Sequence, residues 1–333
     1  MPEFAFLRLR DDAFAIGAGP FTGLPDPPDD SAFYVNGFGL EDPYPWKRPA
    51  QVWIAPGLES LAGEGSAPRL SAWSGPDPAV FGAIFARWKV LLELEHLLKV
   101  VPVLPEMCRL TEGEPRAWTR LLSVATLPLW AYGWFGGEGG FLGLTPERFL
   151  QWEDGLLTTA ALAGTSRPGK EEQFLNDPKQ VREHELVVDD LCSVLAQTGA
   201  VQRSPRRILH LQGLIHYLSE IRVPVRNPLD LNEVIQNMHP TPAMGVLPRR
   251  SAFLDLLMED RRKTGTPPAF GAPFGFWDGA RFHSVIAIRG VFWEDDRLLL
   301  PSGCGLVRES RLESEWEELA LKRHVVKAML HLT

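Results

Sequence analysis

The segment FLQWEDGLLTTAAL (Phe149–Leu162) decides the fold class of this chain. Apolar and threonine-rich runs stand on either side of Asp154-Gly155. An Asp-Gly pair supplies the positive φ angles of a two-residue turn, so this pattern predicts an antiparallel hairpin. The hairpin points to a sheet whose neighbouring strands run in opposite directions.

The flanking sequence extends this sheet and adds helices. Upstream, Trp130–Phe135 and Phe141–Leu144 are predicted strands on either side of a glycine cluster at 136–140. Gly19–Asp30 and Gly57–Asp77 are rich in Pro, Gly, Asp or Ser, which is typical of loops. We expect further strands at Phe4–Arg10, Phe14–Ile16, Lys99–Val101, Ile208–Tyr217, Phe274–Trp277, Phe282–Trp293 and Arg297–Leu300, and helices at Pro78 to about Leu97, Pro178 to about Gln197, Leu229–Asn237, Pro248–Arg262 and Ser310–His331.

Strands and helices are interspersed without a regular βα alternation, which predicts an α+β protein with a large, mainly antiparallel sheet flanked by helices. The chain has 333 residues, which allows one large core. We expect a single domain over 1–333, with an N-terminal part (about 1–98) and a core (about 99–333).

Charge and composition narrow the class of protein. The 42 acidic residues exceed the 34 basic ones, for a formal net charge of −8. This argues against a nucleic-acid binder, because affinity for phosphate backbones depends on Lys and Arg. Three scattered cysteines give no disulfide framework, and the charges within Met1–Ala18 interrupt any signal peptide, so we expect a cytoplasmic protein that does not bind membranes.

Charged residues on two predicted helices could form a metal site. Glu315, Glu318 and Lys322 have the spacing of one helical face, and Glu183 lies on a second acidic helix. Carboxylates that face each other across a cleft would suit Mg²⁺ and an anionic substrate. A solvated charged face is the alternative that the local sequence leaves open. Likewise, Arg289 ends an apolar run and could either clamp a carboxylate or reach into solvent.

Seven motifs, taken in order, resemble the chorismate-utilising enzyme family, which includes isochorismate synthases, salicylate synthases and component I of anthranilate and aminodeoxychorismate synthases. The motifs are GLTPERF (143–149), ALAGTSRPG (161–169), REHELV (182–187), HPTPA (239–243), VIAIR (285–289), GCGLV (303–307) and EWEE (315–318). With Lys99, the resemblance covers roughly Lys99 to Lys322. It implies the component I fold of anthranilate synthase.

The resemblance also implies a pair of catalytic groups. Lys99 stands where water-adding members carry a general base, which activates water for attack at ring C2. Glu147, in Thr145-Pro146-Glu147, matches the general acid that protonates the departing C4 hydroxyl. A lysine can act as a base only if burial or cationic neighbours lower its pKa. The local sequence by itself would instead make Lys99 a surface residue at a helix end.

Further site residues follow from the same resemblance. Glu183 and Glu318 match magnesium ligands, and Glu315 matches a water-mediated or neighbouring ligand, which implies a Mg²⁺ cofactor. The residues that match substrate-binding positions are Gly164, Thr165, His216, Arg289, Gly305 and Lys322.

The lysine at 99 distinguishes the possible reactions. Ammonia-using anthranilate enzymes typically have glutamine there, and aminodeoxychorismate synthases have a nucleophilic lysine in place of Ala163. We therefore expect a Mg²⁺-dependent isochorismate synthase that takes chorismate and needs no glutamine amidotransferase, in menaquinone or siderophore biosynthesis. The alternatives are a salicylate synthase, an ammonia-using synthase component and a chorismate-binding protein without turnover. The atypical stretch Pro102–Pro105 could reshape the chain after Lys99.

Overall fold

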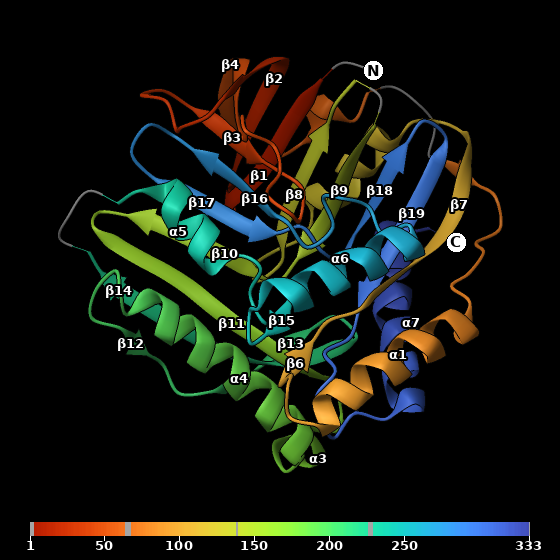
Figure 1. Ribbon diagram of the computed structural model, residues 1–333. Coiled ribbons are helices and arrows are strands. Elements are labelled where there is room, and N and C mark those ends of the chain that lie inside the picture. The colour runs from red at the N-terminus through yellow and green to blue at the C-terminus, as the bar shows by residue number, and fades with distance from the viewer. Residues whose placement is uncertain (1–2, 64–67, 138, 226–228, 333) are drawn as a thin grey trace.

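In the computed structural model, residues 3–63, 68–137, 139–225 and 229–332 are described (Figure 1). The strands are β1 Phe4–Arg10, β2 Ala13–Leu24, β3 Ala32–Val35, β4 Trp46–Ala55, β5 Arg69–Leu70, β6 Lys99–Val100, β7 Val103–Glu112, β8 Trp130–Phe135, β9 Gly139–Thr145, β10 Arg148–Glu153, β11 Leu156–Ser166, β12 Gln202–Arg203, β13 Arg207–Leu211, β14 Leu214–Pro224, β15 Val246–Leu247, β16 Pro273–Trp277, β17 Phe282–Ile286, β18 Gly290–Glu294 and β19 Arg297–Gly303. The α-helices are α1 Pro78–Glu93, α2 Thr119–Ser123, α3 Glu171–Leu175, α4 Pro178–Leu195, α5 Leu231–Met238, α6 Ser251–Thr264 and α7 Leu312–Leu330, and the 3₁₀ helices are η1 Glu59–Leu61 and η2 Pro115–Trp118.

All but two of the described strands form one antiparallel sheet, which confirms the predicted fold class. Neighbouring strands follow the order β5-β7-β19-β18-β9-β8-β1-β2-β4-β3-β16-β17-β10-β11-β14, and β12 and β13 both pair with β14. We call the strands from β5 to β2 the first half and those from β4 to β13 the second half. The remaining strands, β6 and β15, pair with each other.

Aromatic side chains join the two halves of the sheet. Phe141 of β9 packs edge to face against Phe274 of β16, with ring centroids 5.5 Å apart. The ring of Tyr132 in β8 lies 6.1 Å from the Phe274 ring. Such pairs add to the stabilisation from apolar burial. On the outside, α4 packs on β11 and β14, and α7 packs on β19 and α1 (Figure 1).

Several elements form where local chemistry predicts them. Asp154 and Gly155 have φ angles of 50° and 75°, so the β10–β11 hairpin has the turn expected from Asp-Gly. At the start of α1, the Asp77 carboxylate accepts a hydrogen bond from the backbone N–H of Ala79 at 2.8 Å, and Pro78 takes the first helical position.

The predicted loop Gly19–Asp30 is wrong over its first half, because β2 continues to Leu24. The strand passes Gly19-Pro20 through an irregularity between Ala18 and Phe21, and then pairs with β4 alone. Proline is tolerated at such a point, since the missing N–H interrupts no second ladder. The strand Trp46–Ala55 was not predicted. Of the predicted loop Gly57–Asp77, residues 64–67 lie outside the described residues, as does residue 138 of the glycine cluster.

Two predicted strands are each divided in the structure. Ile208–Tyr217 contains a turn at Gln212-Gly213, where Gly213 has a φ of 80°, and so belongs to β13 and β14. Phe282–Trp293 is broken at Ala287–Arg289, because β17 pairs in the second half of the sheet and β18 in the first half. Similarly, α1 ends at Glu93 and not near Leu97. The single-domain organisation stays a prediction.

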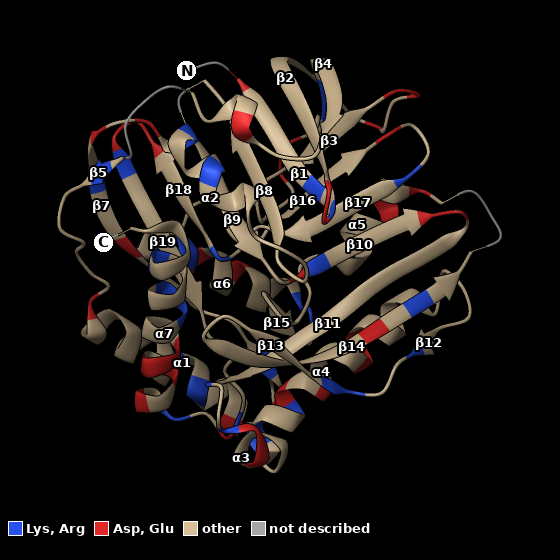
Figure 2. Cartoon of the chain, turned by 180° about the vertical axis from the view of Figure 1, so that it is seen from behind, with Lys and Arg blue, Asp and Glu red and all other residues tan. Residues whose placement is uncertain are grey.

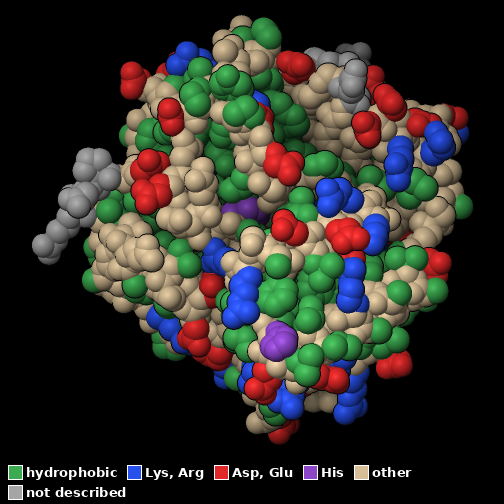
Figure 3. All heavy atoms as spheres, in the orientation of Figure 1, with side chains coloured by type: hydrophobic (Ala, Val, Ile, Leu, Met, Phe, Trp, Pro, Cys, Tyr) green, Lys and Arg blue, Asp and Glu red, His purple; other side chains and the backbone are tan. Residues whose placement is uncertain are grey.

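Charged residues gather on the helices. Figure 2 marks Lys, Arg, Asp and Glu positions along α4 and α7, whereas the strands in the middle of the molecule are mostly uncharged. On the face seen in Figure 3, the surface is hollowed above α6, and charged side chains gather over that helix. No described helix is long and apolar enough to cross a membrane.

Candidate active site

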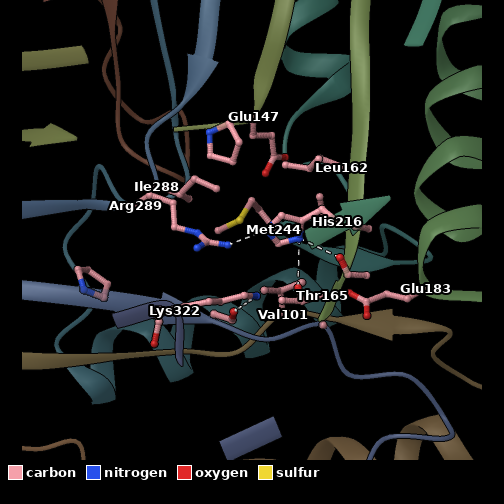
Figure 4. Close-up of a pocket in the computed structure, with 18 of the residues that line it drawn as sticks. Val101, Glu147, Leu162, Thr165, Glu183, His216, Met244, Ile288, Arg289 and Lys322 are labelled. Atoms are coloured by element: carbon pink, nitrogen blue, oxygen red, sulfur yellow. Dashed lines mark hydrogen bonds between the residues drawn. The ribbon is translucent and has the colours of Figure 1, made fainter. Parts of the chain in front are cut away.

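The chain crosses between the two sheet halves at two places, and these crossings bring a glutamate and an arginine to the same cavity. Glu147 lies between β9 and β10, and Arg289 lies between β17 and β18. The crossings are hydrogen-bonded to the ends of each other's strands: Ile286 N–H donates to the Glu147 carbonyl at 3.0 Å, and Leu144 N–H to the Arg289 carbonyl at 3.1 Å. Arg289 has a φ of 57°, in the left-handed region. This turn lies just before β18, and the guanidinium points into a cavity (Figure 4).

Lys99 reaches the same cavity from β6. Its side chain is only 1% exposed, so the alternative of a surface lysine at a helix end is wrong. The Nζ atom donates a hydrogen bond to the Pro242 carbonyl at 2.7 Å and lies 3.4 Å from Glu183 Oε1. Burial lowers the pKa of Lys99 against the opposing effect of Glu183, and Lys322 and Lys179 lower it further.

Glu147 has the opposite shift. Burial raises the pKa of its carboxyl to about 7, although Lys99, Lys322 and Arg289 act in the other direction. The cavity therefore holds a lysine whose ammonium form is disfavoured and a glutamate that retains a proton near neutral pH. A pair of groups shifted in opposite senses is the arrangement that acid–base catalysis requires.

A histidine orients the arginine. Glycine at 164, with a φ of 74°, forms an irregularity in β11 that turns its carbonyl toward His216 Nδ1, at 2.8 Å. A carbonyl only accepts hydrogen bonds, so Nδ1 carries the proton and Nε2 accepts from the Arg289 guanidinium at 3.2 Å. Burial, together with the charge of Arg289, lowers the pKa of His216 to about 3, so the ring is neutral and serves as this acceptor.

Gly305 lets the chain pass beside the charged groups. A Cβ atom at this position would lie 1.9 Å from Glu183 Oε1 and 2.9 Å from Lys99 Nζ. Only glycine fits so close to these two side chains.

The predicted site residues divide between two adjoining cavities. Those that line the first cavity are Lys99, Glu147, Gly164, Thr165, Glu183, His216, Arg289, Gly305 and Lys322. Glu315 and Glu318 line a second, larger cavity instead, which shares Thr165 with the first.

The three acidic residues are paired with lysines. Lys179 Nζ lies 3.2 Å from Glu183 Oε2 and 3.1 Å from Glu315 Oε1, and Lys322 Nζ lies 2.7 Å from Glu318 Oε1. Burial would raise the pKa of Glu183, but Lys179 and Lys99 hold it below its ordinary value. Burial raises the pKa of Glu315 to about 7.

These carboxylates suit a hard cation, although a lysine stands between two of them. Across the described part of the chain, no three His, Cys, Asp or Glu side chains converge as a ready metal centre. The Oε2 atom of Glu315 is nevertheless buried and has no hydrogen-bond partner. A buried oxygen without a partner carries a desolvation cost that a cation would relieve. Carboxylate oxygens are ligands that suit Mg²⁺, which completes its shell with waters.

Lys179 was not predicted, although it contacts two of the predicted acidic residues. It lies four residues before Glu183 on α4, and a Lys–Glu pair at this spacing shares one helical face. That spacing could have indicated the pair. Its contact with Glu315 could not be foreseen, since it joins α4 to α7.

Comparison with known proteins agrees with this geometry. A family model described as "Chorismate binding enzyme" matches residues 124–331, a range that contains both crossings and all of α4 and α7. The chain belongs to the chorismate-binding enzyme family.

Curated members of the chorismate-binding family match part of the chain. A salicylate biosynthesis isochorismate synthase of Pseudomonas aeruginosa is 32% identical over 209 residues, 58% of this chain and 42% of that protein. An anthranilate synthase component 1 of Acinetobacter calcoaceticus is 30% identical over 204 residues, 56% of this chain and 40% of that protein. The matched region thus spans less than half the length of these relatives.

A solved structure of the family has the same fold. The menaquinone-specific isochorismate synthase of Escherichia coli superposes with a TM-score of 0.82 at 22% identity, over 99% of this chain and 89% of the other. The likeness confirms the predicted architecture.

Proposed function

We propose that this protein is a Mg²⁺-dependent isochorismate synthase that converts chorismate and water to isochorismate. The observation that carries the proposal is that Lys99 and Glu147 line one cavity with pKa values shifted in opposite directions. The name of the Pseudomonas aeruginosa relative, a salicylate biosynthesis isochorismate synthase, supports it. The anthranilate synthase relatives are similar enough that the names alone do not decide between water and ammonia.

The two groups would act on opposite ends of an allylic system. Lys99, as the neutral amine, accepts a proton from water as the oxygen forms a bond to ring C2. The ring double bond shifts, the C4–oxygen bond breaks, and Glu147 donates its proton to the departing hydroxyl. One water enters and one leaves, so the product is an isomer of the substrate.

The remaining charged groups would bind and orient chorismate, which carries two carboxylates. Arg289, held by His216, and Lys322, held by Gly303 and Glu318, offer cations to the carboxylates. Glu183 and Glu318 would hold Mg²⁺, with Glu315 as a water-mediated ligand, and the bound cation would offset the charge of the ring carboxylate.

The absence of a lysine at position 163 favours water over a covalent route. Ala163 lines the cavity and offers no nucleophile. With Lys99 as the base, we expect water to be used directly, without ammonia from a glutamine amidotransferase.

The test is incubation of the protein with chorismate and Mg²⁺, followed by chromatography of the products. We expect isochorismate, and its loss when EDTA removes the metal. Salicylate with pyruvate would instead identify a salicylate synthase, and a product that requires ammonium would identify an ammonia-using synthase. No conversion with either water or ammonium would refute the proposal.

A further inference from the structure

A lysine occupies the point between two acidic side chains of the proposed metal site. Lys179 Nζ contacts Glu183 Oε2 at 3.2 Å and Glu315 Oε1 at 3.1 Å, and its side chain is 13% exposed. Glu183 comes from the same helix, α4, whereas Glu315 comes from α7. The ammonium therefore ties two helices together through the carboxylates that a cation would use.

The charges around Lys179 explain why a cation is needed there. The Lys179 ammonium lies within 3.2 Å of two buried carboxylates, Glu183 and Glu315, and offsets their charge there. It supplies a single positive charge and leaves Glu315 Oε2 buried without a partner. A divalent cation supplies twice the charge and accepts six or more oxygen ligands, so it would satisfy these carboxylates more fully.

Lys322 has a different role, although it is also paired with a glutamate. Its Nζ donates to the Gly303 carbonyl at 2.8 Å and contacts Glu318, and it lines the first cavity, where the substrate would bind. Lys179 lines only the second cavity. Of these two lysines, Lys179 is the one that bridges Glu183 and Glu315.

We propose that Lys179 is a built-in competitor for the metal: its ammonium lies between Glu183 and Glu315. Mg²⁺ then binds at Glu183 and Glu318, with Glu315 as the water-mediated ligand, only when the lysine side chain leaves. This inference rests on the metal site of the proposed function, and it adds a residue that sets the affinity of that site. In the metal-free protein, Lys179 keeps the three carboxylates from repelling one another.

The second cavity gives the displaced side chain somewhere to go. Lys179, Glu315 and Glu318 line it, together with Glu309 and Glu317. The Glu309 side chain is exposed, and its ion pair with Arg182 is long, at 3.9 Å, and therefore weak. Glu309 can thus accept a second cation at low cost. A rotation of the flexible Lys179 side chain would thus move its ammonium from the buried carboxylates of Glu183 and Glu315 to the exposed carboxylate of Glu309. The helix α4 would not have to move.

The first experiment measures metal binding without substrate. Mn²⁺ affinity is determined by electron paramagnetic resonance, and Mg²⁺ affinity by calorimetry, for the wild type and for Lys179→Met, which keeps the stem and removes the charge. We expect at least tenfold tighter binding in the variant. Lys179→Arg, which keeps the charge, should show no gain, and Lys170→Met is the matched control because Lys170 is an exposed lysine that lines the same cavity. Equal or weaker binding by Lys179→Met would overturn the proposal.

The second experiment needs no variant. Reductive methylation followed by mass spectrometry reports the accessibility of each lysine in the wild-type protein. We expect labelling of Lys179 to rise severalfold on saturation with Mg²⁺, while labelling of Lys170 stays constant. Unchanged labelling of Lys179 in the metal-saturated protein would contradict the competition. Neither experiment uses turnover, so a protein that releases Lys179 but does not convert chorismate would refute the proposed function alone.

Discussion

The replacement of Lys99 by methionine tests the proposed base directly. Methionine has nearly the length of lysine and can fill the same buried position, so the fold should survive. The substitution leaves the Pro242 carbonyl without its donor, which costs about 1 kcal/mol of stability. Glu183 keeps its contact with Lys179, so no acidic group is left without a cation.

The expected loss of activity is large, because the other described lysines near the cavity are already engaged. Lys322 is bound to Glu318 and the Gly303 carbonyl, and Lys179 to Glu183 and Glu315. A positioned general base contributes about 10²–10⁴-fold to a rate, which corresponds to about 3–5 kcal/mol of barrier. We expect kcat for isochorismate formation to fall within or beyond this range.

Binding of chorismate should change little. Arg289 and Lys322 remain to bind the substrate carboxylates, so we expect Kd to stay within about threefold, or ~0.7 kcal/mol. The assays are product chromatography for kcat, calorimetry for Kd and thermal unfolding for stability. Lys263→Met, at an exposed position on α6, is the control. A Lys99→Met protein that turns over within tenfold of wild type would show that another group is the base.

Three further predictions test other parts of the site and fold. Burial raises the pKa of Glu147 to about 7, and the acid must be protonated to act, so kcat/KM should fall as pH rises through about 7. The Glu147→Gln variant should lower the rate by about 10²-fold or more and should lose this decrease at high pH from its pH–rate profile. Gly305→Ala would place a Cβ 1.9 Å from Glu183 Oε1 and 2.9 Å from Lys99 Nζ, so turnover should fall by about 10²-fold or more, and unchanged kinetics would contradict the described close approach. Gly82→Ala on α1 meets nothing within 4 Å, so urea unfolding should show a gain of about 0.5–1 kcal/mol with unaltered turnover, whereas a loss of stability would mean that this helix face is packed.

Local sequence chemistry predicted those elements whose boundaries are set by a few adjacent residues. The Asp154-Gly155 turn and the Asp77-Pro78 helix start are of this kind, since their determinants lie within four residues. The local sequence did not predict element boundaries where tertiary pairing splits a continuous apolar run into two strands. The run Phe282–Trp293 has no local breaker before Gly290, and it is interrupted at Arg289 because its two ends pair in different halves of the sheet.

The candidate residues themselves could be named from motifs, but their chemical state could not. Local sequence favoured an exposed Lys99, and only the pairing of β6 with β15 and the nearby Pro242 carbonyl bury it. Similarly, nothing adjacent to His216 indicates that the Gly164 carbonyl would determine its tautomer and that Arg289 would bind its Nε2 atom.

The amino-acid sequence by itself determined the antiparallel character of the sheet, the family and the identities of the residues that could carry the chemistry. The tertiary structure alone decided which of those residues share a cavity, and that Lys179 stands between Glu183 and Glu315. The physical reason is that pKa shifts depend on desolvation and on charges a few ångströms away. Both arise only when β6, α4, α7 and the two crossings, far apart along the chain, pack against one another.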